Sequence, residues 1–377
     1  MKNKILFVAN IHKHFRAFHI PYIQYLQSKG YEVHVAANDG ETKIIEADKQ
    51  FNLTINRNPF SSENSKAIRE LAKIIDKEEY CLVHCHTAMG SVVARIAAKK
   101  FRKTGLKVLY TAHGFHFYEG SPKKFWLMYY PMEKYLSKYT DGIITINQED
   151  FQLLERKQFK NKHSFLINGV GVKRKKFNSI SNDEKLNLRK QLGFSENDFI
   201  LVYAAEYIHR KNHAFLIDSI KKLQTKIPNL KVLLAGRGQL FEEVKSLIDQ
   251  SNLERTIIQL GFRTDIDSIY KLSDIGISTS RQEGLGLNLV EEMMCGLPVV
   301  ATIDRGHKEV IDHAENGFLF QQNNHEQFQD YIIQLYNDKF LMSKMGEAAK
   351  EKAKQFELDN SLNQMSEIYQ QFLPNKS

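Results

Sequence analysis

Short apolar runs alternate with longer amphipathic stretches along the first half of the chain. The runs predict strands, and the stretches, in which apolar residues recur every three or four positions, predict helices. The predicted strands are Lys4–Ala9, Glu32–Ala37, Cys81–His84, Lys107–Thr111, Gly142–Ile146 and Ser164–Ile167. The predicted helices are Ile20–Ser28, Ala67–Lys77, Met89–Phe101 and Phe125–Leu136. This alternation is typical of a parallel sheet flanked by helices.

The second half repeats the pattern. Its predicted strands are Phe199–Ala204, Leu230–Ala235, Thr256–Leu260, Ile275–Ser278 and Pro298–Ala301. Its predicted helices are Ala214–Thr225, Leu240–Asp249, Ile266–Leu272 and Leu287–Cys295, followed by a mostly helical tail, Ser343–Leu373. An Asn-Gly turn and a basic run occupy residues 168–182, where we expect a hinge. The pattern therefore predicts two doubly wound, Rossmann-like α/β domains that face a cleft.

Composition places the chain among ordinary globular proteins. Of its 377 residues, 42% are hydrophobic and 26% are charged, and this length is typical of two domains. The longest apolar runs fall short of the ~18–20 residues of a membrane span, and the first one is too short for a signal peptide. Cys81, Cys85 and Cys295 lack CxxC spacing, so we expect no disulfide framework or zinc site. A cytoplasmic location is the expectation.

The charge of the chain is unevenly divided. Residues 1–180 carry 30 Lys and Arg against 16 Asp and Glu, whereas residues 181–377 carry 23 against 28. A basic half suits an anionic partner, such as nucleic acid, an anionic lipid surface or an acidic small molecule. Lys123–Tyr130 mixes cations with aromatic residues and Lys99–Lys103 adds charge, which favours attachment to the inner face of the cell membrane unless the aromatic residues pack in the core. Without a nucleic-acid motif, nucleic acid is not an expected partner.

Two glutamates and a glycine-rich turn, a candidate ligand-binding motif, follow the predicted strand that ends at Ser278. Glu283 stands in a turn whose glycines let backbone approach a ligand closely. A helix then begins near Leu287, and amides at a helix start attract phosphate. Glu291 follows about two turns later, where its carboxylate can accept hydrogen bonds from a vicinal diol such as a ribose. The alternative, two solvated surface glutamates, is disfavoured by the strand–turn–helix–Gly-x-Pro–strand frame around them.

The stretch Ser280–Ala301 resembles the signature of the family 4 retaining glycosyltransferases, which use nucleotide sugars and have the GT-B fold. Typical members read roughly PSxxEGFGLxxLEAMACGxPVVA. Shorter motifs support the resemblance by order and spacing: Val83–His86, Thr111–Gly114, Asn168–Val170, Leu233–Gly238, Leu260–Phe262 and Asn316–Leu319. The chain looks like bacterial enzymes of capsule or exopolysaccharide assembly. The resemblance implies an acceptor domain at residues 1–175, a nucleotide-sugar domain at 176–355, and a C-terminal helix at 356–377 that packs back on the first domain.

The resemblance also implies roles for individual residues in the second domain. Glu291 is expected to hold the nucleotide ribose, and Glu283 to contact hydroxyls of the donor sugar. Gly236 and Gly238 are expected beneath the nucleotide, unless they form a plain strand-to-helix turn. The full set of expected donor-binding residues is Arg210, Gly236, Gly238, Phe262, Arg263, Gly284, Leu285, Gly286, Leu287, Glu291 and Arg305.

One loop departs from the family pattern. After the strand at residues 199–204, members usually place an arginine and, a few residues later, a lysine that clamp the donor diphosphate. Lys211 fits the lysine position, but Glu206 stands at the arginine position, and a carboxylate cannot bind a pyrophosphate. Either Arg210 or Arg305 supplies the missing charge, or Glu206 orients Lys211.

The first domain contributes histidines. By the resemblance, His113 points at the donor sugar, which makes it a catalytic candidate together with Lys211 and Glu283. The segment Asn10–His19 is expected to be a loop, and its lack of GxGxxG disfavours a dehydrogenase-like site. The candidates for acceptor binding are His14, Arg16, His19 and His116. We expect His84 and His86 to pack or hydrogen-bond rather than bind a metal, and without a DxD pair at a strand end we expect no metal at all.

The resemblance implies transfer of a hexosyl or N-acetylhexosaminyl group from a nucleotide sugar, UDP by family habit, to a lipid-linked or saccharide acceptor. Retention of configuration, no cofactor and no metal are implied too, with cations and helix amides stabilising the departing diphosphate. One alternative is a non-catalytic partner subunit that binds a nucleotide sugar, for which Glu206 is the best support. Another is an epimerase or phosphorylase of the same fold. Epimerases do not typically carry the two-glutamate element, and phosphorylases are much longer and need pyridoxal phosphate.

Overall fold

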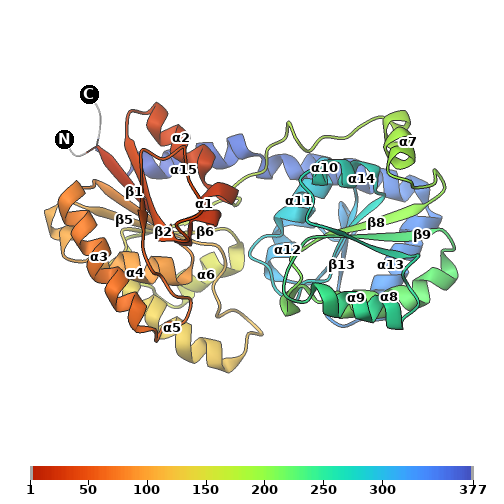
Figure 1. Cartoon of the computed structure of the whole chain (residues 1–377), viewed down its shortest axis with the longest axis horizontal. Coiled ribbons are helices and arrows are strands. Elements are labelled where there is room, and N and C mark those ends of the chain that lie inside the picture. Colours follow the sequence, from red (N-terminus) through yellow and green to blue (C-terminus); the bar gives the residue numbers. More distant parts are fainter. Residues whose placement is uncertain (1–2, 375–377) are drawn as a thin grey trace. The chain divides into compact units, whose positions relative to one another are not determined.

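The structure is a computed structural model that describes residues 3–374, which form two compact units (Figure 1). Unit 1 runs to Gly171 and resumes at Asp359, and unit 2 spans Val172–Leu358. The first boundary therefore falls a few residues before the expected residue 175. The C-terminal segment rejoins unit 1 at Asp359, slightly later than the expected residue 356.

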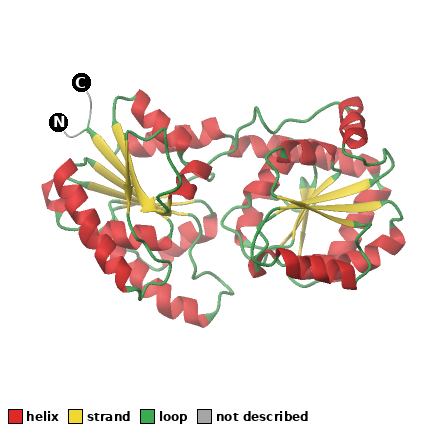
Figure 2. Cartoon of the chain, viewed as in Figure 1, coloured by secondary structure: helices red, strands yellow, loops and turns green. Residues whose placement is uncertain are grey.

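Unit 1 is built on a seven-stranded parallel sheet with helices on both faces (Figure 2). The strands are β1 (Lys4–Ile11), β2 (Glu32–Asn38), β3 (Lys49–Asn52), β4 (Leu82–His86), β5 (Lys107–Ala112), β6 (Gly142–Thr145) and β7 (His163–Leu166). Their order across the sheet is β3-β2-β1-β4-β5-β6-β7. The central strands are buried, which explains their continuous apolar runs. The sequence pattern misses β3 because this short edge strand is polar and half-exposed.

The helices of this part of the chain are α1 (His12–Phe18), α2 (Ile20–Ser28), α3 (Ser62–Glu78), α4 (Ala88–Ala98), η1 (Phe101–Thr104), α5 (Lys123–Ser137), α6 (Gln148–Arg156) and α15 (Leu358–Gln370). The loop expected at residues 10–19 is wrong, because β1 runs on to Ile11 and α1 follows at once. His12 and Phe15 are buried, and this one-turn spacing anchors α1 to the unit. The histidines of the segment are therefore carried by a packed helix and the residue after it.

Unit 2 has the same architecture, with a six-stranded parallel sheet ordered β10-β9-β8-β11-β12-β13. Its strands are β8 (Phe199–Ala204), β9 (Leu230–Ala235), β10 (Ile257–Gly261), β11 (Ile275–Ser278), β12 (Val299–Thr302) and β13 (Gly317–Phe320). Its helices are α7 (Asn182–Gln191), η2 (His209–Lys211), α8 (His213–Lys226), α9 (Phe241–Gln250), α10 (Ile266–Leu272), α11 (Leu287–Met294), α12 (Arg305–Val310), α13 (His325–Asn337), α14 (Lys339–Ala353) and η3 (Lys354–Phe356). The predicted doubly wound α/β class is confirmed.

Each sheet reverses its strand order at one point. In unit 1, β1 lies between β2 and β4, and in unit 2, β8 lies between β9 and β11. At such a switch point the two loops that leave adjacent strands turn away to opposite faces, which opens a crevice at the carboxyl ends of the strands. The loops after β1 and β4, and those after β8 and β11, are therefore where ligands are expected.

The last helix belongs largely to unit 1, where it packs beside α2 (Figure 1). The hydroxyl of Tyr25 on α2 hydrogen-bonds Ser366 on α15. Buried Tyr369 shares a 2.8 Å hydrogen bond with Nδ1 of His84 in β4. These contacts hold the end of the chain against the sheet of unit 1.

Within residues 3–374, each helix is either too short or too polar to cross a bilayer.

A buried ion pair supports β5 in unit 1. Nη2 of Arg95 donates to Oε2 of Glu133 at 2.7 Å, and the guanidinium lies 4.4 Å from the ring centroid of Tyr110. Both charged side chains are almost fully buried. Losing one partner of such a pair leaves a buried charge without its counter-ion.

We predict that Glu133→Gln lowers the free energy of unfolding of unit 1 by about 3 kcal/mol, because Arg95 then stays buried without a counter-charge. Trp126, the only tryptophan, packs against the unit 1 core, so its fluorescence during urea unfolding reports on this unit. The double variant Arg95→Met/Glu133→Leu removes both charges and is expected to be more stable than the single variant. Equal stability of Glu133→Gln and the wild type would contradict the assignment.

Candidate functional site

A buried carboxylate and two cations meet at the switch point of unit 2. Nζ of Lys211 donates to Oε1 of Glu283, and Nη1 of Arg210 donates to Oε2 of the same carboxylate at 2.9 Å. Lys211 and Arg210 come from the loop after β8, and Glu283 comes from the loop after β11. The structure thus brings together two of the three catalytic candidates and one expected diphosphate-binding residue.

The two loops are tied to each other by further hydrogen bonds. The backbone N–H of Arg281 donates to the carbonyl of Arg210 at 2.8 Å. The hydroxyls of Tyr203 and Thr279 both donate to the carbonyl of Lys211, at 2.8 and 3.0 Å. Lys211 is therefore fixed at its backbone as well as at its side chain.

Asp304 fixes the Glu283 turn from the next strand along the sheet. Its Oδ1 accepts the backbone N–H of Glu283 at 3.0 Å and that of Gly306 at 2.8 Å. Gly306 has a steric reason to be glycine, because a Cβ there would lie 2.7 Å from the backbone nitrogen of Leu285. The start of α12 is consequently packed against the turn that carries Glu283.

The electrostatics of this cluster favour an ionised carboxylate. Burial raises the pKa of Glu283, but the cations of Lys211 and Arg210 outweigh it and hold the pKa at about 2. Glu206 is exposed, and within residues 3–374 its carboxylate forms neither a hydrogen bond nor an ion pair with Lys211. The alternative in which Glu206 orients Lys211 therefore finds no support, whereas Arg210 lies beside Lys211 on the same carboxylate.

Glu291 and Glu292 are neighbours in α11 with different surroundings. Oε2 of Glu291 accepts a 3.2 Å hydrogen bond from the hydroxyl of Tyr270, and burial raises the pKa of Glu291 to about 7 against the lowering influence of that hydroxyl and of Lys176. Glu292 faces the core, where a Cβ on Gly276 would lie 2.1 Å from its Oε2. Burial raises the pKa of Glu292 well above its usual range, so this side chain is a neutral core group.

The turn before α11 presents backbone rather than side chains. Gly286, the residue before the helix, has φ of 96°, a left-handed conformation that favours glycine. Leu285 is buried, while Gly284 and Leu287 are partly exposed. Any contact of these residues with a ligand therefore uses main-chain amides at the start of α11.

The glycine turn after β9 is explained by close packing. A Cβ on Gly236 would lie 1.9 Å from the carbonyl oxygen of Ala205, and one on Gly238 would lie 2.5 Å from that of Tyr207. The backbone N–H of Tyr207 donates to the carbonyl of Arg237 at 3.0 Å. The turn thus supports the loop after β8, which leads to Lys211.

Three further donor candidates lie in different surroundings. Phe262 is 62% exposed, and the guanidinium of Arg237 lies 4.6 Å from its ring centroid. Arg263 pairs with Asp265 through two hydrogen bonds of 2.8 and 2.5 Å. Arg305 is buried at the start of α12 rather than exposed as a free surface cation. Of these three side chains, Phe262 is therefore the most exposed to solvent.

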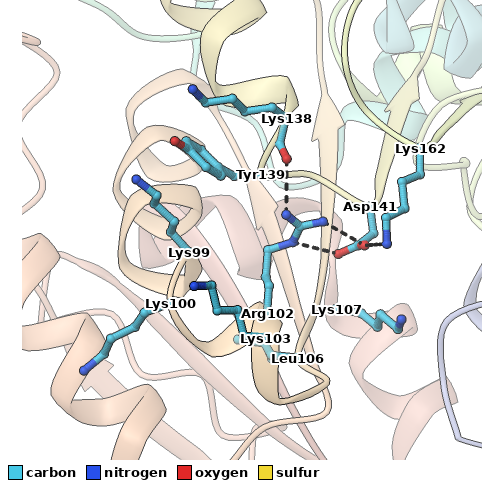
Figure 3. Close-up of a pocket in the computed structure, with 10 residues that line it drawn as sticks. All are labelled: Lys99, Lys100, Arg102, Lys103, Leu106, Lys107, Lys138, Tyr139, Asp141 and Lys162. Atoms are coloured by element: carbon cyan, nitrogen blue, oxygen red, sulfur yellow. Dashed lines mark hydrogen bonds and ion pairs between the residues drawn. The ribbon is translucent and has the colours of Figure 1, made fainter.

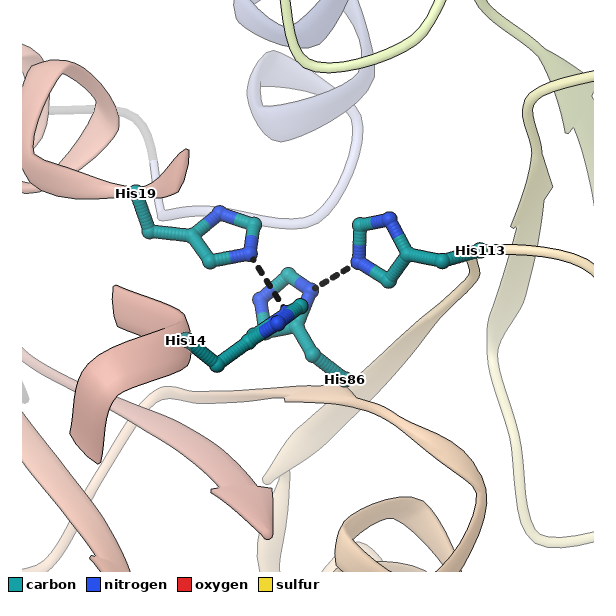
Figure 4. Close-up of side chains that lie close together, drawn as sticks. All are labelled: His14, His19, His86 and His113. Atoms are coloured by element: carbon teal, nitrogen blue, oxygen red, sulfur yellow. Dashed lines mark hydrogen bonds between the residues drawn. The ribbon is translucent and has the colours of Figure 1, made fainter. Parts of the chain in front are cut away.

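The switch point of unit 1 gathers histidines (Figure 4). Nε2 of His19 lies 3.1 Å from Nε2 of His14, and Nε2 of His113 lies 3.4 Å from Nδ1 of His86. Burial lowers the pKa of His113 to about 4. Burial also lowers the pKa of each of the other three well below the usual range, and for these three the neighbouring rings add to the effect. These rings are neutral near pH 7, so His14 and His19 can form hydrogen bonds but carry no positive charge.

The other two acceptor candidates lie apart from this cluster. Nη2 of Arg16 donates to the carbonyl of Lys43 at 2.9 Å, and the side chain is exposed. His116 is exposed, with its ring centroid 4.6 Å from that of Tyr129 in α5. The loop after β5 that carries His113 is anchored by Asp150, whose Oδ2 accepts the backbone N–H of Phe115 at 3.0 Å.

Several residues of these sites escape sequence reasoning. Asp304 follows β12 in the same segment as Arg305, but the sequence does not indicate its two backbone hydrogen bonds, because these depend on how α12 packs. Tyr270 and Arg237 stand beside candidate residues without any signal of their own in the sequence. His86 had a signal, because it ends a strand next to the switch point, where ligand-facing residues are expected.

Comparison with known proteins then identifies the relatives of this chain. The model of "Glycosyl transferases group 1" matches residues 184–352, and that of "Glycosyl transferase 4-like" matches residues 4–147. A relative in Bacillus subtilis (strain 168) is provisionally named as the glycosyltransferase EpsD. It is 42% identical to this chain over 373 residues, which cover 99% of this chain and 98% of that protein. The chain belongs to the family 4 glycosyltransferases.

More distant relatives of this glycosyltransferase agree with the assignment. The UDP-Gal:alpha-D-GlcNAc-diphosphoundecaprenol alpha-1,3-galactosyltransferase of Escherichia coli is 26% identical over 327 residues, covering 86% of this chain and 84% of that protein. The crystal structure of Anabaena Alr3699/HepE in complex with UDP and glucose matches with a TM-score of 0.79 at 22% identity, over 98% of this chain and 99% of that one. The sucrose-phosphate synthase of Thermosynechococcus elongatus matches with a TM-score of 0.81 at 17% identity, with the same coverage. These structures show the shared GT-B fold.

We predict that Lys211→Met raises the pKa of Glu283 from about 2 toward the ordinary glutamate value of about 4.3, because burial then meets less opposing charge. The measurement is a carbon-13 NMR titration of the glutamate carboxyls in the full chain. Lys308→Met removes an exposed lysine from α12 and serves as the matched control, with no expected change. A pKa that stays near 2 in Lys211→Met would show that Lys211 does not stabilise this carboxylate.

Proposed function

We propose that this glycosyltransferase moves a hexosyl or N-acetylhexosaminyl group from a UDP-sugar to a lipid-linked or saccharide acceptor, with retention of configuration, in the assembly of cell-surface polysaccharide. The observation that carries the proposal is the cluster of Glu283, Lys211 and Arg210 at the switch point of the unit 2 sheet. The names of the relatives support the choice of donor and acceptor, since one uses a UDP-sugar and a diphosphoundecaprenol-linked acceptor.

Glu291 is the group that we assign to the ribose of the donor. A carboxylate can accept hydrogen bonds from both hydroxyls of a vicinal diol, and each such charge-assisted bond contributes about 1.5–3 kcal/mol. Its pKa of about 7 is tuned by burial, so near neutral pH the side chain exists in both protonation states. The ionised state is the one that accepts both hydroxyls, and donor binding is therefore expected to strengthen as the pH rises through about 7.

Lys211 and Arg210 are assigned to the departing diphosphate. Negative charge grows on this group as the bond from the anomeric carbon breaks, and fixed cations stabilise it at the transition state. The backbone amides at the start of α11, which follow Glu283 by a few residues in the same motif, add partial positive charge. These groups supply the positive charge that a divalent ion provides in other transferases, and we propose that the donor reaction needs no metal.

The acceptor hydroxyl is proposed to attack the anomeric carbon from the face that the diphosphate leaves. The new bond joins the acceptor oxygen to the anomeric carbon as the bond to the phosphate oxygen breaks, and the leaving phosphate takes the hydroxyl proton. Glu283 is proposed to hold hydroxyls of the donor sugar. Glu283 is already ionised and oriented by two cations, so it is prepared to accept such hydrogen bonds.

The proposal predicts different kinetic defects for two variants in a transfer assay with UDP-sugars and lipid-linked acceptors. Lys211→Ala is expected to lower kcat by at least ~100-fold, because it removes charge stabilisation that is strongest at the transition state. Glu291→Ala is expected to raise the KM for the donor by at least ~100-fold, because two charge-assisted hydrogen bonds to the ribose are lost. Glu291→Gln is expected to abolish the fall of the donor KM as the pH rises through about 7.

Lys308→Ala, which removes an exposed lysine of the same unit, is the matched control and should behave as the wild type. The wild type is expected to stay active in the presence of EDTA, because the proposed donor reaction needs no metal. Unchanged kinetics in both Lys211→Ala and Glu291→Ala would refute the residue assignments. Epimerisation of the nucleotide sugar without transfer to an acceptor would refute the assignment as a transferase.

A non-catalytic partner subunit is the alternative that one observation favours. Glu206 places a carboxylate where the family uses an arginine, which lowers the positive charge of the loop. In that alternative, the purified chain binds a nucleotide sugar in a thermal-shift panel but transfers nothing to any acceptor.

We further propose that unit 1 attaches to an anionic lipid surface. Along α5, exposed residues recur on one face and combine apolar groups with a lysine at each end: Lys124, Leu127, Met128, Pro131, Tyr135 and Lys138. Leu127 is 79% exposed and Tyr135 is 55% exposed. The aromatic residues Trp126 and Tyr130, in contrast, pack against the core. An apolar stripe with cations at its ends suits the boundary between lipid head groups and acyl chains.

A basic hollow adjoins the end of this stripe (Figure 3). It has a volume of about 930 Å³, and Lys138 belongs to both features. Seven cations and one carboxylate are among its lining residues, Lys99, Lys100, Arg102, Lys103, Leu106, Lys107, Lys138, Tyr139, Asp141 and Lys162. Well-placed cations near an anionic bilayer contribute up to ~1 kcal/mol each. The hollow and the stripe together form a surface with the charge and polarity that such a bilayer requires.

We predict that the full chain sediments with vesicles of equimolar phosphatidylglycerol and phosphatidylcholine, and that Leu127→Glu weakens this binding at least ~10-fold through lost apolar contact and charge repulsion. Ile45→Glu makes the same change at an 84% exposed position of unit 1 outside α5, and is expected to bind as the wild type. Equal binding of both variants would contradict the role of α5. Equal binding to pure phosphatidylcholine would contradict the role of the hollow.

A further inference from the structure

Four histidines converge in unit 1 from three separate stretches of the chain (Figure 4). His14 lies in α1 and His19 follows it, His86 is the last residue of β4, and His113 follows β5. One ring nitrogen from each histidine lies within 4.8 Å of those of the other three. The closest pairs are those of 3.1 Å between His19 and His14 and 3.4 Å between His113 and His86.

This spacing is that of a nearly assembled tetrahedral metal site. Zn²⁺ binds imidazole nitrogens at ~2.0–2.1 Å, and a tetrahedron of that size places the four nitrogens roughly 3.3 Å apart. Two of the contacts already have this length, and every other nitrogen pair is within about 1.5 Å of it. A common metal centre therefore requires the remaining nitrogen pairs to move by no more than about 1.5 Å.

The hydrogen bonding of the cluster differs from that of a structural histidine in the same strand. His84 uses both ring nitrogens, each at 2.8 Å, with Tyr369 and Thr111 as partners. In residues 3–374, by contrast, the ring nitrogens of the four clustered histidines hydrogen-bond only to one another. Packing therefore leaves one buried ring nitrogen of the cluster, Nε2 of His86, without a hydrogen-bond partner among residues 3–374.

The exposure of the rings also suits a metal. His14 and His113 are partly exposed, whereas His19 and His86 are buried. An ion can therefore enter from the exposed side, where water reduces the cost of its charge.

We propose that His14, His19, His86 and His113 bind one divalent transition-metal ion of the Zn²⁺ class, each through one ring nitrogen. All-imidazole ligation selects such ions over Mg²⁺ or Ca²⁺, which prefer oxygen ligands. The site lies in unit 1, whereas the residues assigned to the donor diphosphate lie in unit 2. The inference depends on the geometry of the histidines alone, and it gives His86 a role beyond the packing expected from the sequence.

Cobalt provides the most direct test, because four-coordinate Co²⁺ absorbs visible light far more strongly than six-coordinate Co²⁺. The full chain, stripped of metal with EDTA, is titrated with Co²⁺ and then with Zn²⁺ as competitor. We expect an intense visible band that saturates at one Co²⁺ per chain and that Zn²⁺ abolishes. His14→Ala and His86→Ala are each expected to weaken binding by about 100-fold or more, since losing a ligand exceeds the effect of losing an outer-shell partner.

His163→Ala, which removes an exposed histidine of β7, is the matched control and should bind Co²⁺ as the wild type does. Circular dichroism establishes that each variant is folded, and if His86→Ala unfolds, half-exposed His14→Ala decides the outcome. A weak, six-coordinate spectrum would overturn the proposal. Unchanged affinity in His14→Ala, or loss of binding in His163→Ala, would also overturn it.

Discussion

A carboxylate that leaves water stays ionised only if positive charge accompanies it. Glu283 is buried at the carboxyl edge of the unit 2 sheet, and its charge is matched by Lys211 and Arg210 from the neighbouring loop. This constraint fixes the relative position of the loops after β8 and β11, and Asp304 adds a third loop through backbone hydrogen bonds. The same constraint holds three charged side chains together at this edge of the sheet, as the proposed binding of a sugar diphosphate requires.

The two units share one architecture but place opposite chemistry at their switch points. In unit 2, this position holds a buried carboxylate and two cations, and the cations keep the pKa of Glu283 low. In unit 1, the equivalent position holds imidazole rings that burial keeps neutral. The parallel sheet determines where both clusters lie, whereas the side chains determine that one combines a carboxylate with two cations and the other gathers four imidazole rings.

Much of the fold was predictable from sequence because buried parallel strands are apolar on both faces. The ranges of β8, β9 and β11 agree residue for residue with the predicted strands. The pattern failed where packing rather than periodicity decides the structure, as for the half-exposed edge strand β3 and the short helix α1. The glycine turn and the two glutamates of unit 2 were visible because they are close together in the sequence. The histidine cluster was not, because His14 and His113 become neighbours only when β1, β4 and β5 are placed side by side.

The account rests on the assignment of the unit 2 crevice to a nucleotide, and a crystal structure of the full chain with UDP tests it most directly. The account predicts the ribose hydroxyls within about 3 Å of the carboxylate of Glu291, with the diphosphate against Lys211 and the first amides of α11. A nucleotide bound anywhere else on the chain, with the crevice between the loops after β8 and β11 left empty, would contradict it.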